Sequence, residues 1–210
     1  MSTVRTLTPG DITSAATLLA EAFFTNPAHV YMCPDVESRM KKIEWILATN
    51  LRLQASFEHS FCLAPKGRVT AMGFWTRHDT AEPGAMRKLR SGLLIAHLRM
   101  GRGGMRRLQE VIDGMHRDRV KALGEAPYWF LNNMVVDESL RGTGVGSKLL
   151  GEQLRLIEQR DSSANFALAT QRKENVVFYQ RLGFEVTVEA AIGQGPNAFT
   201  NWIMQRRADA

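Results

Sequence analysis

Apolar side chains recur at helical spacing through the first part of the chain. This spacing predicts a helix from Asp11 to Phe24, with Asp11 as its N-cap and with Asn26-Pro27 ending it. A second helix is expected from about Ser38 to Phe57. A short strand from Val4 to Leu7 precedes both helices. The buried stripe predicted for the second helix consists of Met40, Ile43, Ile46, Leu47 and Leu51.

From about residue 60 the pattern becomes that of strands. Phe61 to Ala64 and Val69 to Thr76 flank Pro65-Lys66-Gly67, which is typical of a β-hairpin. Tyr128 to Val136 is apolar nearly throughout, so we expect a strand that is buried on both faces. Helices and strands then alternate: a helix from Gly144 to Arg160, a strand from Phe166 to Thr170, a helix from Asn175 to Leu182, and strands from Phe184 to Val188 and from Phe199 to Met204.

The segment from residue 83 to residue 124 interrupts the strands. Its apolar positions have helical spacing, and Gly101 to Gly104 divides it into a predicted pair of helices. From Arg87 to Lys121 it holds ten basic and three acidic residues, a formal charge of +7, while the rest of the chain sums to −1. The chain contains no flexible linker. We therefore expect one domain over residues 1–210, with a basic helical insertion at about residues 83–124.

The composition of the 210-residue chain, 44% hydrophobic and 23% charged, is that of a folded globular protein. No apolar run approaches the roughly 18 residues of a membrane span, and the N-terminus lacks the apolar region of a secretory signal. We therefore expect a cytoplasmic protein that does not cross a membrane. Cys33 and Cys62 match no zinc-ligand or disulfide pattern, so no metal is expected. The formal charge of +6 raises nucleic acid or an acidic ligand as a partner.

A glycine-rich turn follows the strand that ends at Val136 and opens directly into a helix. Glycines allow a tight turn with inward N–H groups, the helix N-terminus adds partial positive charge, and Arg141 adds a full charge, so the turn is suited to phosphate. It is not a P-loop, because Ser147 separates Gly146 from Lys148, and it lacks the spacing of a dinucleotide fingerprint. A tight turn that binds nothing is the alternative.

Arg141, Gly144 and Gly146 occupy the fixed positions of the pattern Q/R-x-x-G-x-G/A, so the turn resembles the acetyl-CoA loop of the GNAT-type N-acetyltransferase superfamily. Asp137-Glu138 stands where many members have Asp-Pro. The resemblance implies an α/β (α+β) GNAT fold: a mixed, mostly antiparallel central sheet with splayed fourth and fifth strands, flanked by helices. It also implies acetyl-CoA as cosubstrate, held by Met134, Val135, Val136, Arg141, Gly142, Thr143, Gly144, Val145, Gly146 and Ser147.

The segment from Asn175 to Phe184 has the form N-x-x-F-Y-x-x-x-G-F and resembles a second motif of the same superfamily. In that motif the tyrosine commonly protonates the departing CoA thiolate. The resemblance therefore implies Tyr179 as the general acid, with Asn175 and Phe178 beside the cofactor. Alternatively, Phe178 and Tyr179 are an aromatic pair that packs a helix on the sheet.

The layout of the whole chain resembles the puromycin N-acetyltransferase-like branch of this superfamily, including Gly195-Pro196 followed by Trp202-x-Met204. Members often carry Glu-Thr-Ser at the fifth strand, whereas this chain has Ala169-Thr170-Gln171. Because that carboxylate is lost, puromycin is not carried over as the substrate.

The expected function is acetyl-CoA-dependent transfer of an acetyl group, directly, to the primary amine of a small molecule. Two alternatives stay open: a nucleic-acid-binding module that uses the basic helices, which lack interleaved aromatic residues, and a CoA-binding regulator without catalysis. Nucleic acid is not the expected partner, and a homodimer is left open. No general base is evident. His29, Glu58, His78 and Glu82 are candidates, but residues of these kinds are more often solvated surface residues. An amine that arrives partly neutral, or a water relay, would make a dedicated base unnecessary. Trp75, Tyr128 and Trp129 either line an acceptor pocket or belong to the core.

Overall fold

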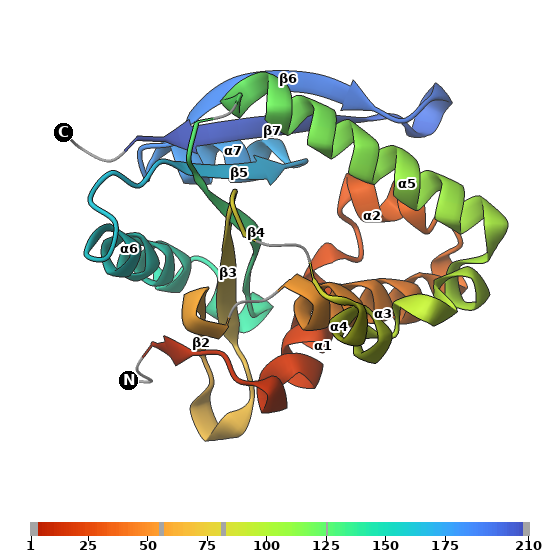
Figure 1. The fold of residues 1–210 in the computed structure, drawn as a ribbon, viewed down its shortest axis with the longest axis horizontal. Coiled ribbons are helices and arrows are strands. Elements are labelled where there is room, and N and C mark those ends of the chain that lie inside the picture. The colour runs from red at the N-terminus through yellow and green to blue at the C-terminus, as the bar shows by residue number, and fades with distance from the viewer. Residues whose placement is uncertain (1–3, 55–56, 81–82, 125, 208–210) are drawn as a thin grey trace.

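A seven-stranded sheet organises the molecule, with its strands in the order β1-β2-β3-β4-β5-β7-β6 (Figure 1). The computed structural model describes residues 4–54, 57–80, 83–124 and 126–207. Within these residues, neighbouring strands pair antiparallel except for β4 and β5, which are parallel. The strands are β1 (Arg5–Thr6), β2 (Ser60–Leu63), β3 (Ala71–Arg77), β4 (Trp129–Val136), β5 (Phe166–Thr170), β6 (Glu185–Ile192) and β7 (Phe199–Arg206).

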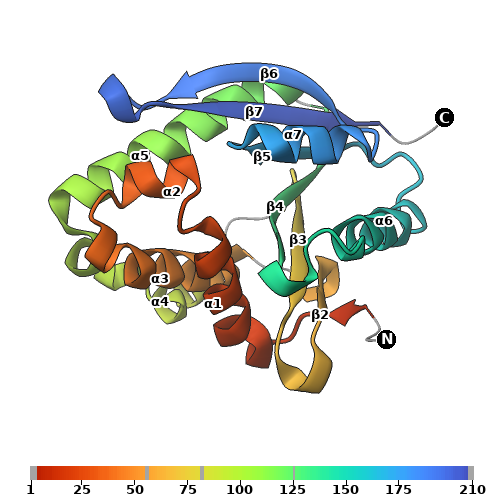
Figure 2. The ribbon, with the colours of Figure 1, turned by 180° about the vertical axis from the view of Figure 1, so that it is seen from behind.

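Helices cover both faces of the sheet, as the view from behind also shows (Figure 2). On one face α1 packs against α3, and α5 lies along β6 and β7. On the other face α6 packs on β3 and β4, and α7 packs on β5 and β6. The helices are α1 (Ile12–Phe23), α2 (Pro27–Met32), α3 (Val36–Gln54), α4 (Ala85–Ser91), α5 (Ala96–Leu123), α6 (Val145–Glu158) and α7 (Lys173–Gln180).

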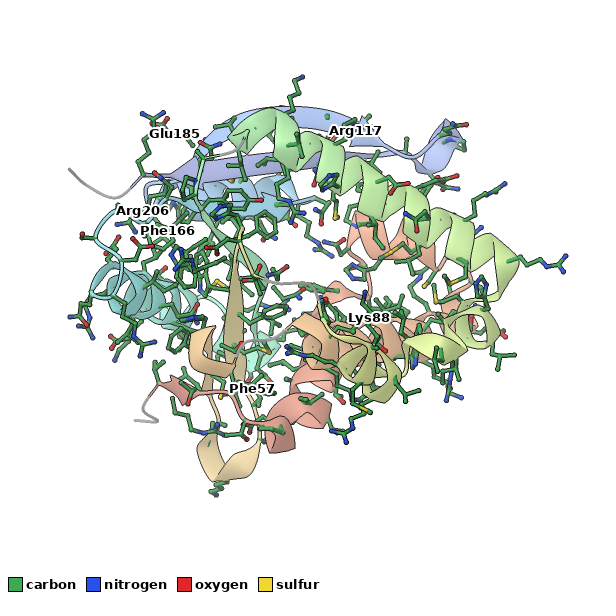
Figure 3. All side chains as sticks on the ribbon, in the orientation of Figure 1. Phe57, Lys88, Arg117, Phe166, Glu185 and Arg206 are labelled. Carbon is green, nitrogen blue, oxygen red and sulfur yellow. The ribbon has the colours of Figure 1, made fainter. Side chains whose placement is uncertain are left out.

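The hydrophobic core is divided by the sheet into two clusters. Phe74 of β3 and Ile43 of α3 belong to the cluster under α1 and α3. Trp75, the next residue of β3, belongs with Phe166 of β5, labelled in Figure 3, to the cluster under α6. Their rings meet edge to face with centroids 5.5 Å apart. Because successive side chains of a strand point to opposite faces, β3 supplies both cores at once.

β4 and β5 separate along their length. They pair only at Trp129, Phe130 and Leu131, after which β4 continues to Val136 without β5. On its other side β4 carries an extra residue, because Phe74 lies opposite Asn133 and Trp75 lies opposite Leu131. Such a β-bulge bends the strand that carries it. The mixed, mostly antiparallel sheet with a splayed fourth and fifth strand, predicted from the sequence, is therefore confirmed.

The N-terminal helices differ from the prediction in how they begin. A short 3-10 turn, Pro9–Asp11, precedes α1. Asp11 does not cap α1 with its side chain; its carboxylate accepts from the backbone N–H of Thr8 at 2.8 Å and pairs with Arg5 at 2.7 Å. Asp11 is thus the N3 residue of a capping box whose N-cap is Thr8.

Asn26-Pro27 starts a helix rather than only ending one. Pro27 is the first residue of α2, and Asn26 caps that helix by accepting a hydrogen bond from the Ala28 N–H at 3.0 Å. Proline suits the first helical position because its missing N–H would have no partner there. The sequence prediction missed α2 for this reason.

The predicted burial holds for part of two elements. In α3, Ile43, Leu47 and Leu51 are buried, whereas Ile46 is half-buried and Met40 is exposed. In β4 only the positions Trp129, Leu131 and Val135 are buried. The prediction of burial on both faces of β4 was wrong, because Phe130, Asn132 and Met134 are only half-buried and line a cavity.

The basic helical segment is interrupted at two places. α4 ends at Ser91, followed by Gly92 with φ 91°, and α5 begins at Ala96. Within α5, Gly101 has non-helical φ 67° and ψ 169°, so a kink lies where the sequence predicted the division. Part of the charge is used inside the fold, since Arg107 donates to the Met32 carbonyl at 3.3 Å and Arg117 pairs with buried Asp118 at 2.9 Å.

None of the helices in the four described ranges combines the length and the apolar character of a membrane-spanning segment. In the same part of the chain, no three His, Cys, Asp or Glu side chains are grouped so that they could hold a metal ion. Cys33 and Cys62 are buried free thiols.

Candidate active site

The glycine loop, residues 141–147, joins the end of β4 to α6. Gly142 and Gly144 have φ of 77° and 82°, in the left-handed region that side chains disfavour. The first backbone hydrogen bond of α6 runs from the Lys148 N–H to the Gly144 carbonyl at 3.0 Å. The N–H groups of Val145, Gly146 and Ser147 therefore have no acceptor within the helix. Free N–H groups at the positive end of a helix are suited to an anion.

Gly146 lies where the glycine loop, the end of β4 and α7 meet. A Cβ at this position would be 3.4 Å from Cγ2 of Val136 and 3.6 Å from Cζ of Phe178. Arg141 is exposed, with its Nε 3.4 Å from the Val136 carbonyl. The two sequence motifs are thus brought into contact around the strand end.

Tyr179 of α7 points into the interior and is 9% exposed. Its ring centroid lies 5.1 Å from that of Phe178 and 5.9 Å from that of Phe184, so the aromatic packing foreseen as an alternative role is present. Burial raises the pKa of Tyr179, so the hydroxyl keeps its proton at neutral pH. Such a group can donate a proton but does not accept one.

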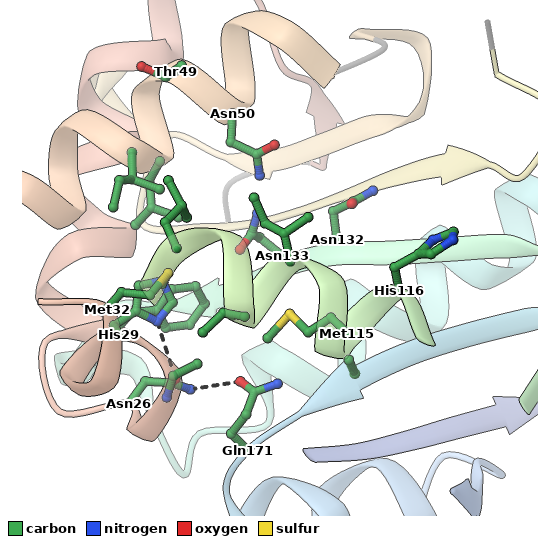
Figure 4. A pocket seen from close by; sticks show the side chains of 18 of the residues that line it. Asn26, His29, Met32, Thr49, Asn50, Met115, His116, Asn132, Asn133 and Gln171 are labelled. Atoms are coloured by element: carbon green, nitrogen blue, oxygen red, sulfur yellow. Dashed lines mark hydrogen bonds between the residues drawn. The ribbon is translucent and has the colours of Figure 1, made fainter. Parts of the chain in front are cut away.

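A cavity of about 560 Å³ lies between the N-terminal helices, α5 and the diverging ends of β4 and β5 (Figure 4). Tyr179, Asn175 and Met134 line it, whereas the described residues of the glycine loop do not. Asn175 Nδ2 donates to Thr170 Oγ1 at 3.2 Å, which ties α7 to the end of β5. Tyr179 therefore forms part of the cavity wall while its neighbour Phe178 faces the glycine loop.

Most of the cavity wall is apolar. Carboxamides add hydrogen-bonding groups, and Figure 4 shows those of Asn50, Asn132, Asn133 and Gln171. The Thr49 hydroxyl is buried without a hydrogen-bond partner in the described part of the chain. Among the described residues, the lining side chains with a formal charge are one aspartate and one arginine, Asp113 and Arg119. The apolar lining includes Phe23, Met32, Trp45, Ile46, Leu53, Met105, Leu108, Ile112, Met115 and Phe130.

Of the four candidates for a general base, His29 is the one that the structure places in the cavity wall. His78 packs against Tyr128, with ring centroids 5.5 Å apart, and lies outside that wall. Glu82 and the side chain of Glu58 lie outside the described residues. Burial lowers the pKa of His29 to about 4, so its imidazole is neutral near pH 7.

Trp75, Tyr128 and Trp129, which the sequence suggested for an acceptor pocket, do not line the cavity. Trp75 and Trp129 are buried in the core on the α6 side of the sheet. Phe23, Trp45 and Phe130 line the cavity instead. The helical spacing of Trp45 within α3 gave no sign of this, because the spacing shows which face is apolar but not what that face meets.

Known proteins share this architecture. Residues 101–186 match the model of the acetyltransferase (GNAT) domain family. A structure from Corynebacterium glutamicum, described as histone acetyltransferase HPA2 and related acetyltransferase, is similar over 100% of this chain and 98% of its own, with a TM-score of 0.67 and 20% identity. The chain has the GNAT fold.

Two further solved structures are similar to this chain in fold. Arylalkylamine N-acetyltransferase 2 from Aedes aegypti has a TM-score of 0.60 and 13% identity, with 99% of each chain covered. PaiA N-acetyltransferase from Thermoplasma acidophilum, in complex with coenzyme A, has a TM-score of 0.52 and 12% identity, again with 99% of each chain covered. These neighbours share the fold, and the GNAT domain match supports an N-acetyltransferase enzyme.

Proposed function

We propose that this protein transfers the acetyl group of acetyl-CoA directly to the primary amine of a small molecule with a largely apolar body. The observation that carries the proposal is the position of Tyr179. Its motif contacts the glycine loop through Phe178, and its own side chain lines the cavity. The Tyr179 hydroxyl, a proton donor, thus lies between the glycine loop, which is suited to an anion, and the cavity, which is suited to the acceptor amine.

The glycine loop is the proposed site for the pyrophosphate of acetyl-CoA. Its free N–H groups and Arg141 fit that group, and the positive φ of Gly142 and Gly144 gives the loop its shape. A Cβ at Gly142 or Gly144 would meet nothing within 4 Å, so the loop faces open space. Thr143 and Ser147 complete it.

The end of β4 is the proposed site for the thioester oxygen. The Asp137 N–H donates to the Thr70 carbonyl at 2.8 Å, on the β3 side. Because N–H directions alternate along a strand, the N–H groups of Met134 and Val136 face the side from which β5 has diverged. This supports Val136 rather than Val135 as the donor to the carbonyl of the acyl group.

Tyr179 is the proposed general acid. Its raised pKa keeps a proton available for the leaving sulfur, which becomes negative as the thioester bond breaks. Asn175, held by Thr170, lies beside it as a polar contact for the pantetheine arm. Phe178 packs beside the glycine loop and shapes the same region.

The cavity supports a monoamine as the acceptor. A polyamine would need several carboxylates, whereas Asp113 is the carboxylate that the described wall offers, and Arg119 stands in the same wall. The apolar lining fits an aromatic or aliphatic body. The unpartnered Thr49 hydroxyl and the carboxamide of Asn50 offer hydrogen bonds to a polar group at its far end. The puromycin N-acetyltransferase-like branch, whose substrate has an aromatic body, agrees with this chemistry as a proposed subfamily.

The experiment is an assay of free CoA release with matched amines. Phenethylamine and an aminonucleoside represent apolar monoamines, and spermidine and agmatine represent polycations. We expect kcat/KM to favour the monoamines. Calorimetric binding of acetyl-CoA without turnover on any amine would favour the CoA-binding regulator, and absence of acetyl-CoA binding would exclude both.

A further inference from the structure

A chain of side-chain hydrogen bonds connects a buried carboxylate to the cavity. Asn201 Nδ2 donates to Oδ2 of Asp118 at 3.0 Å, and Gln171 Nε2 donates to Oδ1 of Asn201 at 2.9 Å. Asn26 Nδ2 then donates to Oε1 of Gln171 at 3.3 Å, and Oδ1 of Asn26 lies 3.2 Å from Nδ1 of His29 (Figure 4). The chain thus links α5, β7, the residue that follows β5 and the start of α2.

The carboxylate end sets the direction of the whole chain. Asp118 is 1% exposed, and Arg117, labelled in Figure 3, donates to its Oδ1 through Nε at 3.0 Å and Nη2 at 2.9 Å. An ionised carboxylate only accepts, so Asn201 must turn its NH₂ toward Asp118 and its oxygen toward Gln171. The same reasoning turns the NH₂ of Gln171 toward Asn201 and its oxygen toward Asn26.

The other end of the chain requires the same direction. The Ala28 backbone N–H, which only donates, bonds to Oδ1 of Asn26 at 3.0 Å. Oδ1 of Asn26 is therefore fixed as the oxygen by a neighbour that cannot reverse, independently of Asp118. Because that oxygen also faces Nδ1 of His29, Nδ1 carries the proton, and Nε2 keeps its lone pair.

His29, at the end of the chain, lies in the cavity wall. Gln171 directly follows Thr170, the last residue of β5, so the middle of the chain of bonds lies beside the diverging strands. Phe23 stacks on the imidazole with ring centroids 5.1 Å apart. The other titratable groups of the cavity wall are Tyr179 on α7 and Asp113, His116 and Arg119 on α5, and burial is the cause of the low pKa of His29.

We propose that Nε2 of His29 accepts the N–H proton of the acceptor amine, and that Asn26 is a positioning residue whose oxygen, fixed by the Ala28 N–H, sets the His29 tautomer. The hydrogen bonds through Gln171 and Asn201 to Asp118 support the same direction. The proposal rests on the proposed function. As the amine nitrogen bonds to the acyl carbon and the C–S bond breaks with its electron pair on sulfur, the nitrogen loses one proton to Nε2. Sulfur takes the hydroxyl proton of Tyr179. His29 then releases its proton to water, and Tyr179 regains one from water.

Asp118→Asn is expected to break the chain rather than to reverse all of it. Arg117 only donates, so the new carboxamide must turn its oxygen toward Arg117 and its NH₂ toward Asn201, and Asn201 and Gln171 then turn over. The Ala28 N–H still holds Oδ1 of Asn26, so the NH₂ groups of Gln171 and Asn26 face each other and their hydrogen bond is lost. Oδ1 of Asn26 still faces Nδ1 of His29, so the Nδ1–H form persists.

The decisive measurement is the NMR shift of the ring nitrogens in protein that carries isotope-labelled histidine, with the His29 signals assigned by their loss in His29→Gln. We expect the Nδ1–H form in the wild-type protein and also in Asp118→Asn, because the Ala28 N–H holds Oδ1 of Asn26 toward Nδ1 in both. The Nε2–H form in the wild-type protein would overturn the proposal, whether or not any amine is acetylated. This measurement therefore tests the tautomer separately from the proposed function.

Kinetics test the catalytic part with an amine that the protein acetylates. His29→Gln should lower kcat by about 10²-fold, within the usual contribution of a positioned base, and leave the Kd of acetyl-CoA unchanged. Asp118→Asn, which leaves Oδ1 of Asn26 on Nδ1 of His29, should lower kcat by less than His29→Gln does. Asp79→Asn, the same substitution at an exposed residue paired with Arg77, is the matched control and should leave kcat unchanged. Wild-type kcat in His29→Gln would overturn the proposed role of Nε2.

Discussion

The last two glycines of the loop, Gly144 and Gly146, are expected to respond in opposite ways to the same substitution. Gly144 has φ 82° and ψ −2°, and a Cβ there would meet nothing within 4 Å. The cost of Gly144→Ala is therefore backbone strain alone, roughly 1–2 kcal/mol. Gly146 is helical, and its new Cβ would make an ordinary contact with Val136 at 3.4 Å. Alanine is favoured over glycine inside a helix by up to about 1 kcal/mol, so Gly146→Ala should be neutral or stabilising.

Thermal unfolding and acetyl-CoA titration measure the difference. For a chain of this size each kcal/mol shifts Tm by roughly 2–4 °C, so Gly144→Ala should lower Tm by roughly 2–8 °C, whereas Gly146→Ala should not lower it. If the loop relieves its strain by moving, the N–H groups lose their arrangement, and acetyl-CoA affinity in Gly144→Ala should fall by roughly 5- to 30-fold. Equal Tm losses in the two variants, or a larger loss in Gly146→Ala, would refute the idea that the left-handed conformation is what requires glycine here.

Four further outcomes are expected. Tyr179→Phe should lower kcat by roughly 10²- to 10⁴-fold while calorimetry shows an unchanged Kd for acetyl-CoA, and an unchanged kcat would remove Tyr179 from the chemistry. Arg141→Ala should weaken acetyl-CoA binding about tenfold in low salt and by less in high salt, and no change would place the pyrophosphate elsewhere. The Arg5 guanidinium holds the pKa of Asp11 well below its usual range, so this carboxylate stabilises the fold above about pH 4 and loses that effect as pH falls. Asp11→Asn should therefore make the free energy of unfolding depend less on pH in the acid range, as measured by urea unfolding across pH. Because the pKa of His29 is about 4, the rise of kcat/KM between pH 6 and pH 9 should follow the pKa of the amine used, and a rise at one fixed pH for amines of different pKa would contradict this.

The sequence predicted the features whose chemistry is local. The glycine loop follows from the spacing of Gly142, Gly144 and Gly146, since a left-handed turn and a helix start are properties of neighbouring residues. The resemblance to known acetyltransferases implied that Asn175 and Phe178 lie beside the cofactor. It did not predict that Phe178 would lie against Gly146, where a Cβ would be 3.6 Å from its ring. The hairpin around Pro65-Lys66-Gly67 is also local.

The cavity could not be predicted because no local pattern encodes it. Its wall combines residues of α1, α2, α3, α5, β4, β5 and α7, which come together only through tertiary packing. The apolar run in β4 was interpreted as burial on both faces, although Phe130 and Met134 face the cavity instead. The link from His29 to Asp118 spans 89 positions and depends on Gln171 and Asn201, two carboxamides that the sequence gives no reason to pair.

Burial in the cavity wall shifts the pKa values of Tyr179 and His29 in opposite directions. Loss of water disfavours the charged form of each, which raises the pKa of Tyr179 and lowers that of His29 to about 4. At neutral pH the tyrosine is therefore held as a proton donor, and the histidine is held as a neutral ring. Burial alone does not decide which nitrogen of that ring is free. The Ala28 N–H decides it, since it requires Oδ1 of Asn26 to face Nδ1, and the hydrogen bonds from Asp118 support the same direction. Desolvation thus sets the charge of the acid and of the proposed acceptor, while the hydrogen-bond chain sets the direction in which the acceptor points.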